Sequence, residues 1–234
     1  MVFKLLCVGH VLGDFYFQSD KMAKEKGKKW RILILHCFIY FIVLLGILIL
    51  FCENGTWWAK LSVAGIASII HGGIDKGKTV ASNRKWFQKE AILFLIDQGL
   101  HIGLLYILSL LISAGISEKG DMISGMLMPF LGFLVCWKPA SIFIAMVFHS
   151  IPGTGKNQQK NVGTGIGSWI GILEREIILV LGNMGQFAAI GFVLTAKSFA
   201  RYKQLENQDF AEKYIVGTLL SSLIAFVCVW LCQI

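Results

Sequence analysis

The sequence predicts an all-α, polytopic integral membrane protein with about eight membrane spans, within a range of six to eight. Of the 234 residues, 56% are hydrophobic and 15% are charged, whereas a soluble domain carries about 25% charged residues. Apolar runs at 31–52, 91–114 and 214–234 are near or above the roughly 18 residues that a helix needs to cross a bilayer. Basic segments alternate with the apolar ones, which is typical of a multi-pass protein.

Each predicted helix lies between basic or turn-forming segments. Residues 2–18 are as short and apolar as a signal peptide, but they lack a small-residue cleavage site, so we interpret them as a retained first helix. Tryptophans near the predicted ends, such as Trp30, Trp57 and Trp137, are typical of an aromatic belt at the membrane surface. In chain order the predicted spans are 2–18, 31–52, 57–75, 91–114, 120–137, 166–183, 184–200 and 214–234.

The second half of the chain contains two less regular stretches. Pro139 interrupts an apolar run, and a proline removes a backbone donor, so 139–151 can form an interfacial helix instead of part of a span. Residues 166–200 contain short spans with charged side chains, which also fits a re-entrant or tilted arrangement. We expect one domain, in which a four-helix region at 1–114 is followed by further membrane helices at 115–234.

The net charge of +8 is unevenly distributed along the chain. Seventeen of the 22 lysines and arginines lie in four segments, at 19–31, 76–90, 152–164 and 197–213. The positive-inside rule predicts that these segments are cytoplasmic and that the N-terminus is outside. This alternation favours the lipid bilayer and anionic headgroups as partners over nucleic acid. The sequence carries no indication of the oligomeric state.

Three histidine–aspartate pairs lie inside apolar stretches, with the two residues of each pair four positions apart. Such residues share one face of a helix. Ionisable groups at the centre of a membrane cost about 3 kcal/mol or more, so they are rare there and usually functional. Together with His36, the pairs fall in the cytoplasmic half of the predicted spans, and we expect them to surround one polar cavity open to the cytoplasm. The pairs are His10/Asp14, His71/Asp75 and Asp97/His101.

This set of side chains suits a divalent metal ion. Imidazoles and carboxylates without thiolates favour Zn²⁺, Mn²⁺ or Fe²⁺, and three of each are enough for two ions. A bound metal lowers the pKa of a water ligand and polarises a phosphoryl or carbonyl oxygen. The aspartates Asp14, Asp75 and Asp97 are the predicted catalytic residues. The predicted metal ligands are His10, Asp14, His36, His71, Asp75, Asp97 and His101.

Other polar residues are candidates for binding an anionic substrate or for a second cluster. Basic and amide side chains close to the pairs would attract a phosphate or an anionic headgroup. These candidates are Gln18, Lys26, Lys78, Arg84 and Gln98. In the second half, Glu174 or Glu176 can pair with Arg175 or Lys197 across the helices, and a buried structural pair is an equal alternative. The second polar cluster is Glu174, Arg175, Lys197 and Arg201.

Two alternatives to a metal site remain open at this stage. The pairs can be structural, because polar residues hydrogen-bond between membrane helices, at about 0.6 kcal/mol on average. They can also form a proton relay, since histidines and carboxylates both suit proton transfer.

The order of these residues resembles a bacterial family of multi-pass membrane proteins built around a domain of unknown function. The pattern is His-x3-Asp-Phe-x2-Gln, Met-Ala-x2-Lys, Leu-His, His-x2-Ile-Asp-x2-Lys and Asp-Gln-x2-His, and it covers about 5–110. The resemblance implies one grouped site in a protein of the bacterial cytoplasmic membrane, and it implies no activity. Here it is carried by His10, Asp14, Phe15, Gln18, Met22, Ala23, Lys26, Leu35, His36, His71, Ile74, Asp75, Lys78, Asp97, Gln98 and His101.

Three functions follow, in order of preference. The first is a metal-dependent hydrolase or transferase that acts on a phosphorylated or lipidic substrate at the inner leaflet. The second is a proton- or ion-coupled transporter that uses the same cluster, although transporter sites usually lie near the membrane midplane. The third is a non-catalytic adaptor that binds anionic lipid or a cytosolic partner.

Overall fold

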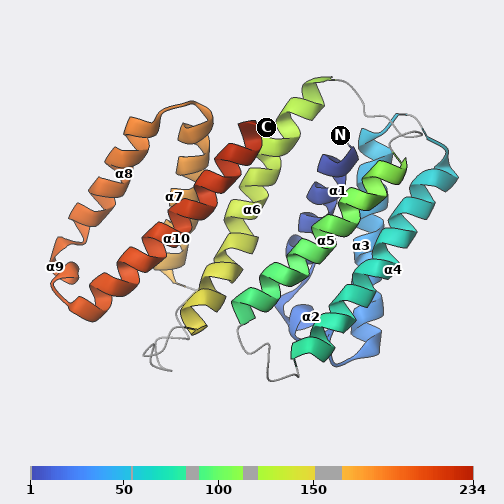
Figure 1. Ribbon diagram of the computed structural model, residues 1–234, viewed down its shortest axis with the longest axis horizontal. Coiled ribbons are helices and arrows are strands. Elements are labelled where there is room, and N and C mark those ends of the chain that lie inside the picture. The colour runs from blue at the N-terminus through green and yellow to red at the C-terminus, as the bar shows by residue number, and fades with distance from the viewer. Residues whose placement is uncertain (1, 54, 83–89, 113–120, 151–164, 234) are drawn as a thin grey trace. The chain divides into compact units, whose positions relative to one another are not determined.

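The computed structural model describes residues 2–53, 55–82, 90–112, 121–150 and 165–233. These residues are almost entirely helical and contain no strand, so the predicted all-α fold is confirmed (Figure 1). The chain divides into two compact units, Met1–Leu131 and Gly132–Ile234. Each unit is described below by itself.

Unit 1 is built around four helices that surround the predicted site. Helix α3 packs against α4, α4 against α5, and α1 against both α3 and α5. The short helix α2 begins at Ser19, whose hydroxyl accepts a hydrogen bond from the backbone of Met22 at 3.2 Å, as an N-cap does. The elements are α1 (Val2–Val11), the π-helical turn η1 (Leu12–Tyr16), α2 (Asp20–Glu25), α3 (Trp30–Phe51), α4 (Trp57–Ser82), α5 (Glu90–Ile112) and the first part of α6 (Asp121–Ser150).

Two glycines let α1 and η1 approach α3 closely. A Cβ atom on Gly9 would lie 2.5 Å from a methyl carbon of Leu44, and one on Gly13 would lie 2.8 Å from the ring of Tyr40. Small residues four positions apart are a common way of packing membrane helices. The backbone after Val11 then widens into the π turn that carries Asp14. Single π turns occur often at functional sites.

Unit 2 consists of a helical hairpin packed on two longer helices. Helices α7 and α8 are joined at Gly185, which has a φ of 71°, a left-handed conformation that glycine adopts without strain. Its apolar core includes Cys136, Ile178, Ile190 and Val229, which come from four different helices. The elements are the remainder of α6, α7 (Ile166–Asn183), α8 (Phe187–Ala200), α9 (Tyr202–Leu205) and α10 (Gln208–Gln233).

Helix α6 does not break at Pro139. The sequence allowed a separate interfacial helix at 139–151, but α6 continues through the proline to Ser150. The carbonyl of Cys136, one turn before the proline, accepts a hydrogen bond from Arg175 Nε at 2.6 Å, and Ser141 Oγ donates to the carbonyl of Trp137 at 2.6 Å. Neighbouring side chains commonly satisfy backbone groups next to a proline in membrane helices, and the bond from Arg175 satisfies the carbonyl three positions before Pro139.

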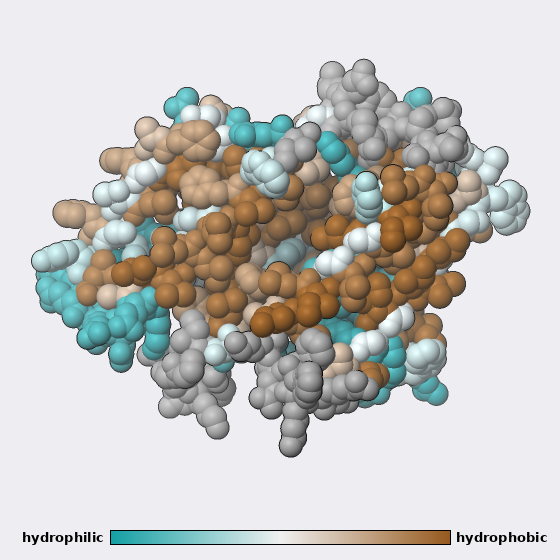
Figure 2. Space-filling model, in the orientation of Figure 1, coloured by the Kyte–Doolittle hydropathy of each residue, from teal (hydrophilic) through white to brown (hydrophobic). Residues whose placement is uncertain are grey.

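Four helices are long and apolar enough to cross a membrane: α3, α5, α6 from Gly125 onward, and α10. All eight predicted spans coincide with helices, but the other four segments carry charges or are short. Helix α8 has 14 residues, about 21 Å at the usual rise, less than the roughly 30 Å of a bilayer core. Brown, hydrophobic surface covers the middle of α4 and α5 in unit 1, and the teal surface collects near α2 (Figure 2).

Candidate metal centre

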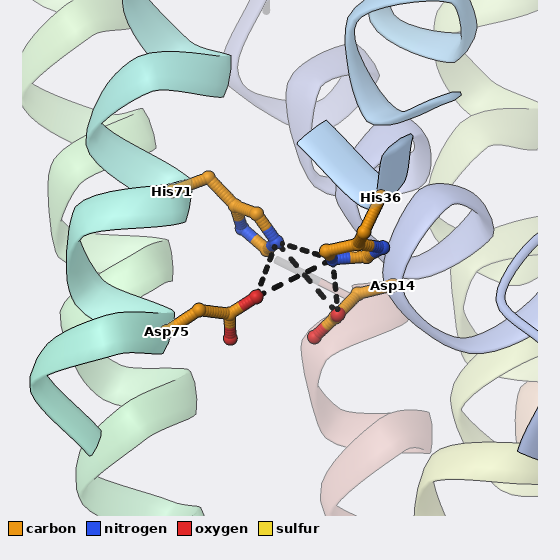
Figure 3. A group of neighbouring side chains, drawn as sticks. All are labelled: Asp14, His36, His71 and Asp75. Atoms are coloured by element: carbon orange, nitrogen blue, oxygen red, sulfur yellow. Dashed lines mark hydrogen bonds and ion pairs between the residues drawn. The ribbon is translucent and has the colours of Figure 1, made fainter. Parts of the chain in front are cut away.

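The bundle of unit 1 encloses the three predicted histidine–aspartate pairs and His36. All seven side chains are buried. Asp14 comes from η1, His36 from α3, and His71 with Asp75 from α4, and their polar ends point toward one another (Figure 3). The structure therefore brings together residues from distant parts of the sequence at one place in the core.

The first group of possible ligands is Asp14, His36, His71 and Asp75. His36 Nε2 lies 2.9 Å from His71 Nε2, 3.3 Å from Asp14 Oδ1 and 3.4 Å from Asp75 Oδ2. His71 Nε2 lies 3.4 Å from Asp75 Oδ2 and 3.8 Å from Asp14 Oδ1. Four electron-rich atoms thus converge from three elements of the bundle.

These distances fit a small tetrahedral cation. Nitrogen and oxygen ligands about 2.0–2.1 Å from a zinc ion, at tetrahedral angles, lie about 3.3–3.4 Å from one another. The five distances between donor atoms scatter around this value, from 2.9 to 3.8 Å. The group can therefore hold a divalent ion with small movements of its side chains.

Lys26, which follows α2, reaches the same atoms from one end of the bundle. Its Nζ lies 2.7 Å from Asp75 Oδ2, 3.0 Å from Asp14 Oδ1 and 3.2 Å from His36 Nε2. Burial alone would lower the pKa of Lys26, but attraction to Asp14 and Asp75 outweighs it and raises this pKa above its usual value. The ammonium group therefore stays charged and neutralises part of the charge of the two aspartates.

The second group of possible ligands is Asp75, Asp97 and His101. His101 Nδ1 donates to the backbone carbonyl of Asp97 at 2.8 Å. Because a carbonyl only accepts, the proton must be on Nδ1, and Nε2 keeps its lone pair. His101 Nε2 and Asp97 Oδ1 are buried and have no hydrogen-bond partner among the described residues. This orientation of a histidine is common at metal sites.

Asp75 belongs to both groups, so its carboxylate can bridge two ions. The first group offers four protein ligands, which is typical of a closed metal site, and the second offers three, which is typical of a site with an open position. Two-metal sites with ions about 3.5–4 Å apart are common in phosphatases and nucleases. Each of the two groups thus has a composition that could hold a metal ion.

His10 lies outside both groups because its two ring nitrogens have other partners. His10 Nε2 is 3.1 Å from Gln98 Oε1, and His10 Nδ1 is 3.2 Å from the hydroxyl of Tyr40. The amide of Gln98 donates to Asp97 Oδ2 at 3.2 Å and to Asp14 Oδ2 at 3.5 Å. This network connects the aspartates of the two groups and holds both carboxylates in position.

The Nδ1 atoms of His36 and His71 have fewer hydrogen-bond partners than the ring nitrogens of His10. In the described part of the chain, Nδ1 of His36 and Nδ1 of His71 are buried without a hydrogen-bond partner. Histidines that bind metals usually donate a hydrogen bond from this second nitrogen. The ring of His71 instead stacks on Tyr40, with the ring centroids 4.0 Å apart and the planes 11° apart.

The residues expected to bind an anionic substrate have different surroundings. Lys78 pairs with Asp97 at 2.8 Å, as Lys26 does with the other two aspartates. Gln98 contacts the aspartates directly, and the buried Oε1 atom of Gln18 has no hydrogen-bond partner among the described residues. Arg84 lies outside the described residues.

Tyr40 is a residue of the site that the sequence analysis missed. It is 1% exposed and contacts both His10 and His71. Tyr40 follows His36 by four positions and therefore shares its helix face. A search for all polar residues on that face, rather than for histidines and aspartates alone, would have found it.

In the second half of the chain, the predicted polar cluster is also buried in part. Glu174 pairs with Lys197, one of the pairings that the sequence left open, while Arg175 bonds to neutral groups. The guanidinium of Arg201 lies over the ring of Tyr214, at 5.9 Å from its centroid. These residues belong to unit 2.

The fold and the site define a class of protein: a helical chain with helices suited to crossing a membrane and a buried histidine–aspartate cluster that can hold a metal ion. The chain belongs to the DUF3307 family, described as a protein of unknown function, whose family model matches residues 2–124. The match contains all seven predicted ligands and confirms the resemblance seen in the sequence. No curated protein and no solved structure matches the chain.

Proposed function

We propose that unit 1 is a metal-dependent hydrolase or transferase that acts on a phosphate-containing lipid at the inner leaflet of the bacterial cytoplasmic membrane. The observation that carries this proposal is the convergence of four buried donor atoms at distances that fit a tetrahedral ion. A second group shares Asp75 and offers three ligands. Zinc suits this geometry best, and manganese or iron would accept the same ligands.

In this proposal, Asp14, His36, His71 and Asp75 would hold one ion, and Asp75, Asp97 and His101 would hold another. A bound ion supplies an acidified water molecule and polarises the phosphoryl oxygen. We assign the reaction to the second group because catalytic zinc sites have three protein ligands and one open position. Gln98, held by His10, orients the carboxylates of Asp14 and Asp97, and Lys78 partly balances the charge of Asp97.

A hydrophobic groove beside this site supports a lipid substrate. The groove has a volume of about 970 Å³ and runs along α3 and α4. Its lining includes Cys37 and Gly72, the immediate chain neighbours of His36 and His71. Among the described residues of the lining, Lys76 carries the charge, and it would attract an anionic headgroup. We assign the groove to an acyl chain of the substrate, whose headgroup would then lie close to the metal ligands.

The proposal includes the eight-crossing topology. In this topology the N-terminus is outside and the basic segments, including Lys26 and Lys78, are cytoplasmic. The site then opens toward the inner leaflet, where anionic lipids are partners of the basic segments. The eight helices that coincide with the predicted spans support this arrangement.

The decisive experiment measures bound metal and hydrolysis in the same preparation. The full chain is purified in lipid nanodiscs without added metal, and its zinc, manganese and iron are measured by mass spectrometry. Release of phosphate or headgroup is then followed with vesicles of phosphatidic acid and of phosphatidylglycerol. We expect stoichiometric metal in the wild type and a loss of both metal and activity in His71→Ala. The control is His149→Ala, which changes an exposed histidine outside the cluster.

Some outcomes would remove the proposal. Active protein without stoichiometric metal, unaffected by His71→Ala, would rule out metal chemistry at this site. Bound metal with ion flux in proteoliposomes, abolished by Asp97→Asn and without any hydrolysis, would favour the transporter. A cellular function that persists in His71→Ala, but is lost when the charged residues of segment 24–29 are replaced by residues of opposite charge, would favour the adaptor.

The groove can be tested separately with glycines of α4. A Cβ atom on Gly73 or Gly77 would meet nothing within 4 Å, so a leucine at either position would project into open space along the groove. Gly99 and Gly103 of α5 have equally open surroundings and do not line the groove. We expect Gly73→Leu and Gly77→Leu to reduce turnover of lipid substrate without a change in metal content, and Gly99→Leu and Gly103→Leu to change neither. Equal turnover in all four variants would exclude the groove as the acyl-chain site.

A further inference from the structure

Unit 2 contains a basic pocket that the proposed metal chemistry does not use. The cavity has a volume of about 260 Å³ and is lined by residues of α6, α7, α8 and α10 and by Arg201. Among the described residues, four basic side chains and one acidic side chain line it. They are Arg175, Lys197, Arg201, Lys213 and Glu174.

Arg175 is the central charge of this pocket and is only 3% exposed. Its guanidinium donates from Nε to the carbonyl of Cys136 at 2.6 Å, from one terminal nitrogen to Ser221 Oγ at 3.2 Å, and from the other to Ser141 Oγ at 2.7 Å. All three acceptors are neutral. The guanidinium is thus held in a fixed orientation, but no carboxylate among the described residues forms an ion pair with it.

The one acidic residue of the lining already has a partner. Glu174 forms an ion pair with Lys197, which also donates to the hydroxyl of Thr218 at 3.2 Å. Glu176 follows Arg175 in the sequence but does not line the cavity, and its carboxylate oxygens have no hydrogen-bond partner in the described part of the chain. The positive charge of the pocket therefore exceeds the negative charge of its lining.

A buried positive charge without a counter-ion is costly, and an anion that enters the pocket would compensate it. Arginine and lysine are the usual ligands of phosphate groups, and a guanidinium offers several donors in a fixed plane. The hydroxyls of Ser141, Thr218 and Ser221 add short polar side chains to the same lining. The size of the cavity suits a headgroup rather than a complete lipid, since pockets for drug-sized ligands have about 300–1,000 Å³.

The pocket also lies at the basic end of unit 2. Lys197 is in the last turn of α8, Arg201 follows that helix, and Lys213 is in the second turn of α10. Hydrophilic surface collects around α9 and the start of α10, while the middle of α10 is hydrophobic (Figures 1 and 2). Such a position suits a ligand with its charge at the membrane surface.

We propose that this pocket binds a phosphate group, carried either by an anionic lipid headgroup or by a soluble phosphate compound. The site is independent of the metal centre and would exist whether or not unit 1 is an enzyme.

Two probes distinguish the sources of the phosphate. The full chain in phosphatidylcholine nanodiscs is titrated with inorganic phosphate by calorimetry, and its binding of phosphatidylglycerol against phosphatidylcholine is measured by native mass spectrometry. The test variant is Arg201→Gln/Lys213→Gln, at the rim of the pocket, and Arg201→Gln alone serves if the double variant does not fold. Lys203→Gln is the control matched to Arg201→Gln, because it removes one positive charge from an exposed side chain that does not line the cavity.

We expect saturable binding of at least one probe, weakened about tenfold or more in the rim variant because charge-assisted hydrogen bonds are lost. Lys203→Gln should bind as the wild type does. Binding of phosphatidylglycerol alone identifies a headgroup site, and binding of inorganic phosphate identifies a site for soluble phosphates. Equal binding in the rim variant and the control, or no saturable binding of either probe, would overturn the proposal.

Discussion

The two units both bury charged side chains between apolar helices, but the sign of the unbalanced charge differs. In unit 1 the buried cluster is built of three aspartates with imidazoles, and two lysines pair with these aspartates. In unit 2 the buried centre is an arginine bonded to neutral oxygens, and the nearby glutamate is paired with a lysine. In the first cluster the carboxylates outnumber the ammonium groups. In the second cluster the basic side chains outnumber the carboxylates.

This difference predicts different classes of ligand for the two units. Buried acceptors without a hydrogen-bond partner among the described residues, such as Asp97 Oδ1 and His101 Nε2, favour a cation. A guanidinium that already donates to three neutral acceptors favours an anion. A count of buried polar residues would rank the two clusters as equivalent. Their charge balance and their unsatisfied atoms separate them.

The largest expected effect concerns the shared aspartate. Asp75→Asn removes a charged ligand from both groups, and we expect the metal content to fall from about two ions to below one per chain. Asp97→Asn should remove only the ion of the second group. Metal analysis of purified protein provides the measurement, and Asp209→Asn, which changes an exposed acidic residue in unit 2, is the control. Equal loss in Asp75→Asn and Asp97→Asn would contradict a bridging role.

The second effect concerns the ion pair of unit 2. Glu174→Ala leaves Lys197 without its carboxylate in a largely buried position, which costs about 3 kcal/mol, at the lower end of the range for buried pairs. Chemical denaturation in detergent should detect this loss, while the metal content stays at the wild-type level. A drop in metal content would show that the two clusters are coupled and would break the contrast between the units.

The third effect tests whether Lys26 competes with a metal ion. Its ammonium lies within 3.2 Å of three of the four donor atoms in the first group, and like charges repel strongly at such distances. We expect Lys26→Met to bind zinc about tenfold more tightly or better. Competition with a chelating dye measures the affinity, and Lys29→Met is the control because Lys29 is exposed and pairs with Glu25. An unchanged affinity for zinc would mean that Lys26 can move away from the donor atoms without a cost in free energy.

The smallest effect compares one hydroxyl in each unit. Tyr40→Phe removes the bond to His10 but keeps the stacking on His71, so we expect a loss of about 1 kcal/mol in the free energy of unfolding. Tyr214→Phe removes a bond to Ser198 in a half-buried position and should cost less. Chemical denaturation measures both losses in the free energy of unfolding. A larger loss for Tyr214→Phe than for Tyr40→Phe would contradict the greater burial of the Tyr40 network.

Much of the fold and of the first site could be predicted from residues alone. Each of the eight predicted spans overlaps a helix of the described residues, because long apolar runs and basic boundaries are local signals that need no tertiary information. The spacing of four residues identified the faces that carry His10/Asp14, His71/Asp75 and Asp97/His101. The continuous helix at Pro139 could not be predicted, since Arg175, 39 positions from Cys136, bonds to the carbonyl one turn before the proline.

The sequence by itself determined which segments form helices and which helix faces carry the histidines and aspartates. Only the tertiary structure decided that Asp75 belongs to two groups, that His10 supports Gln98 instead of joining a group, and that Lys26 contacts the donor atoms themselves. The physical reason is the range of the interactions. Helix periodicity is set within about one turn of the chain, whereas the charge balance of a buried cluster depends on atoms brought within about 4 Å from distant segments.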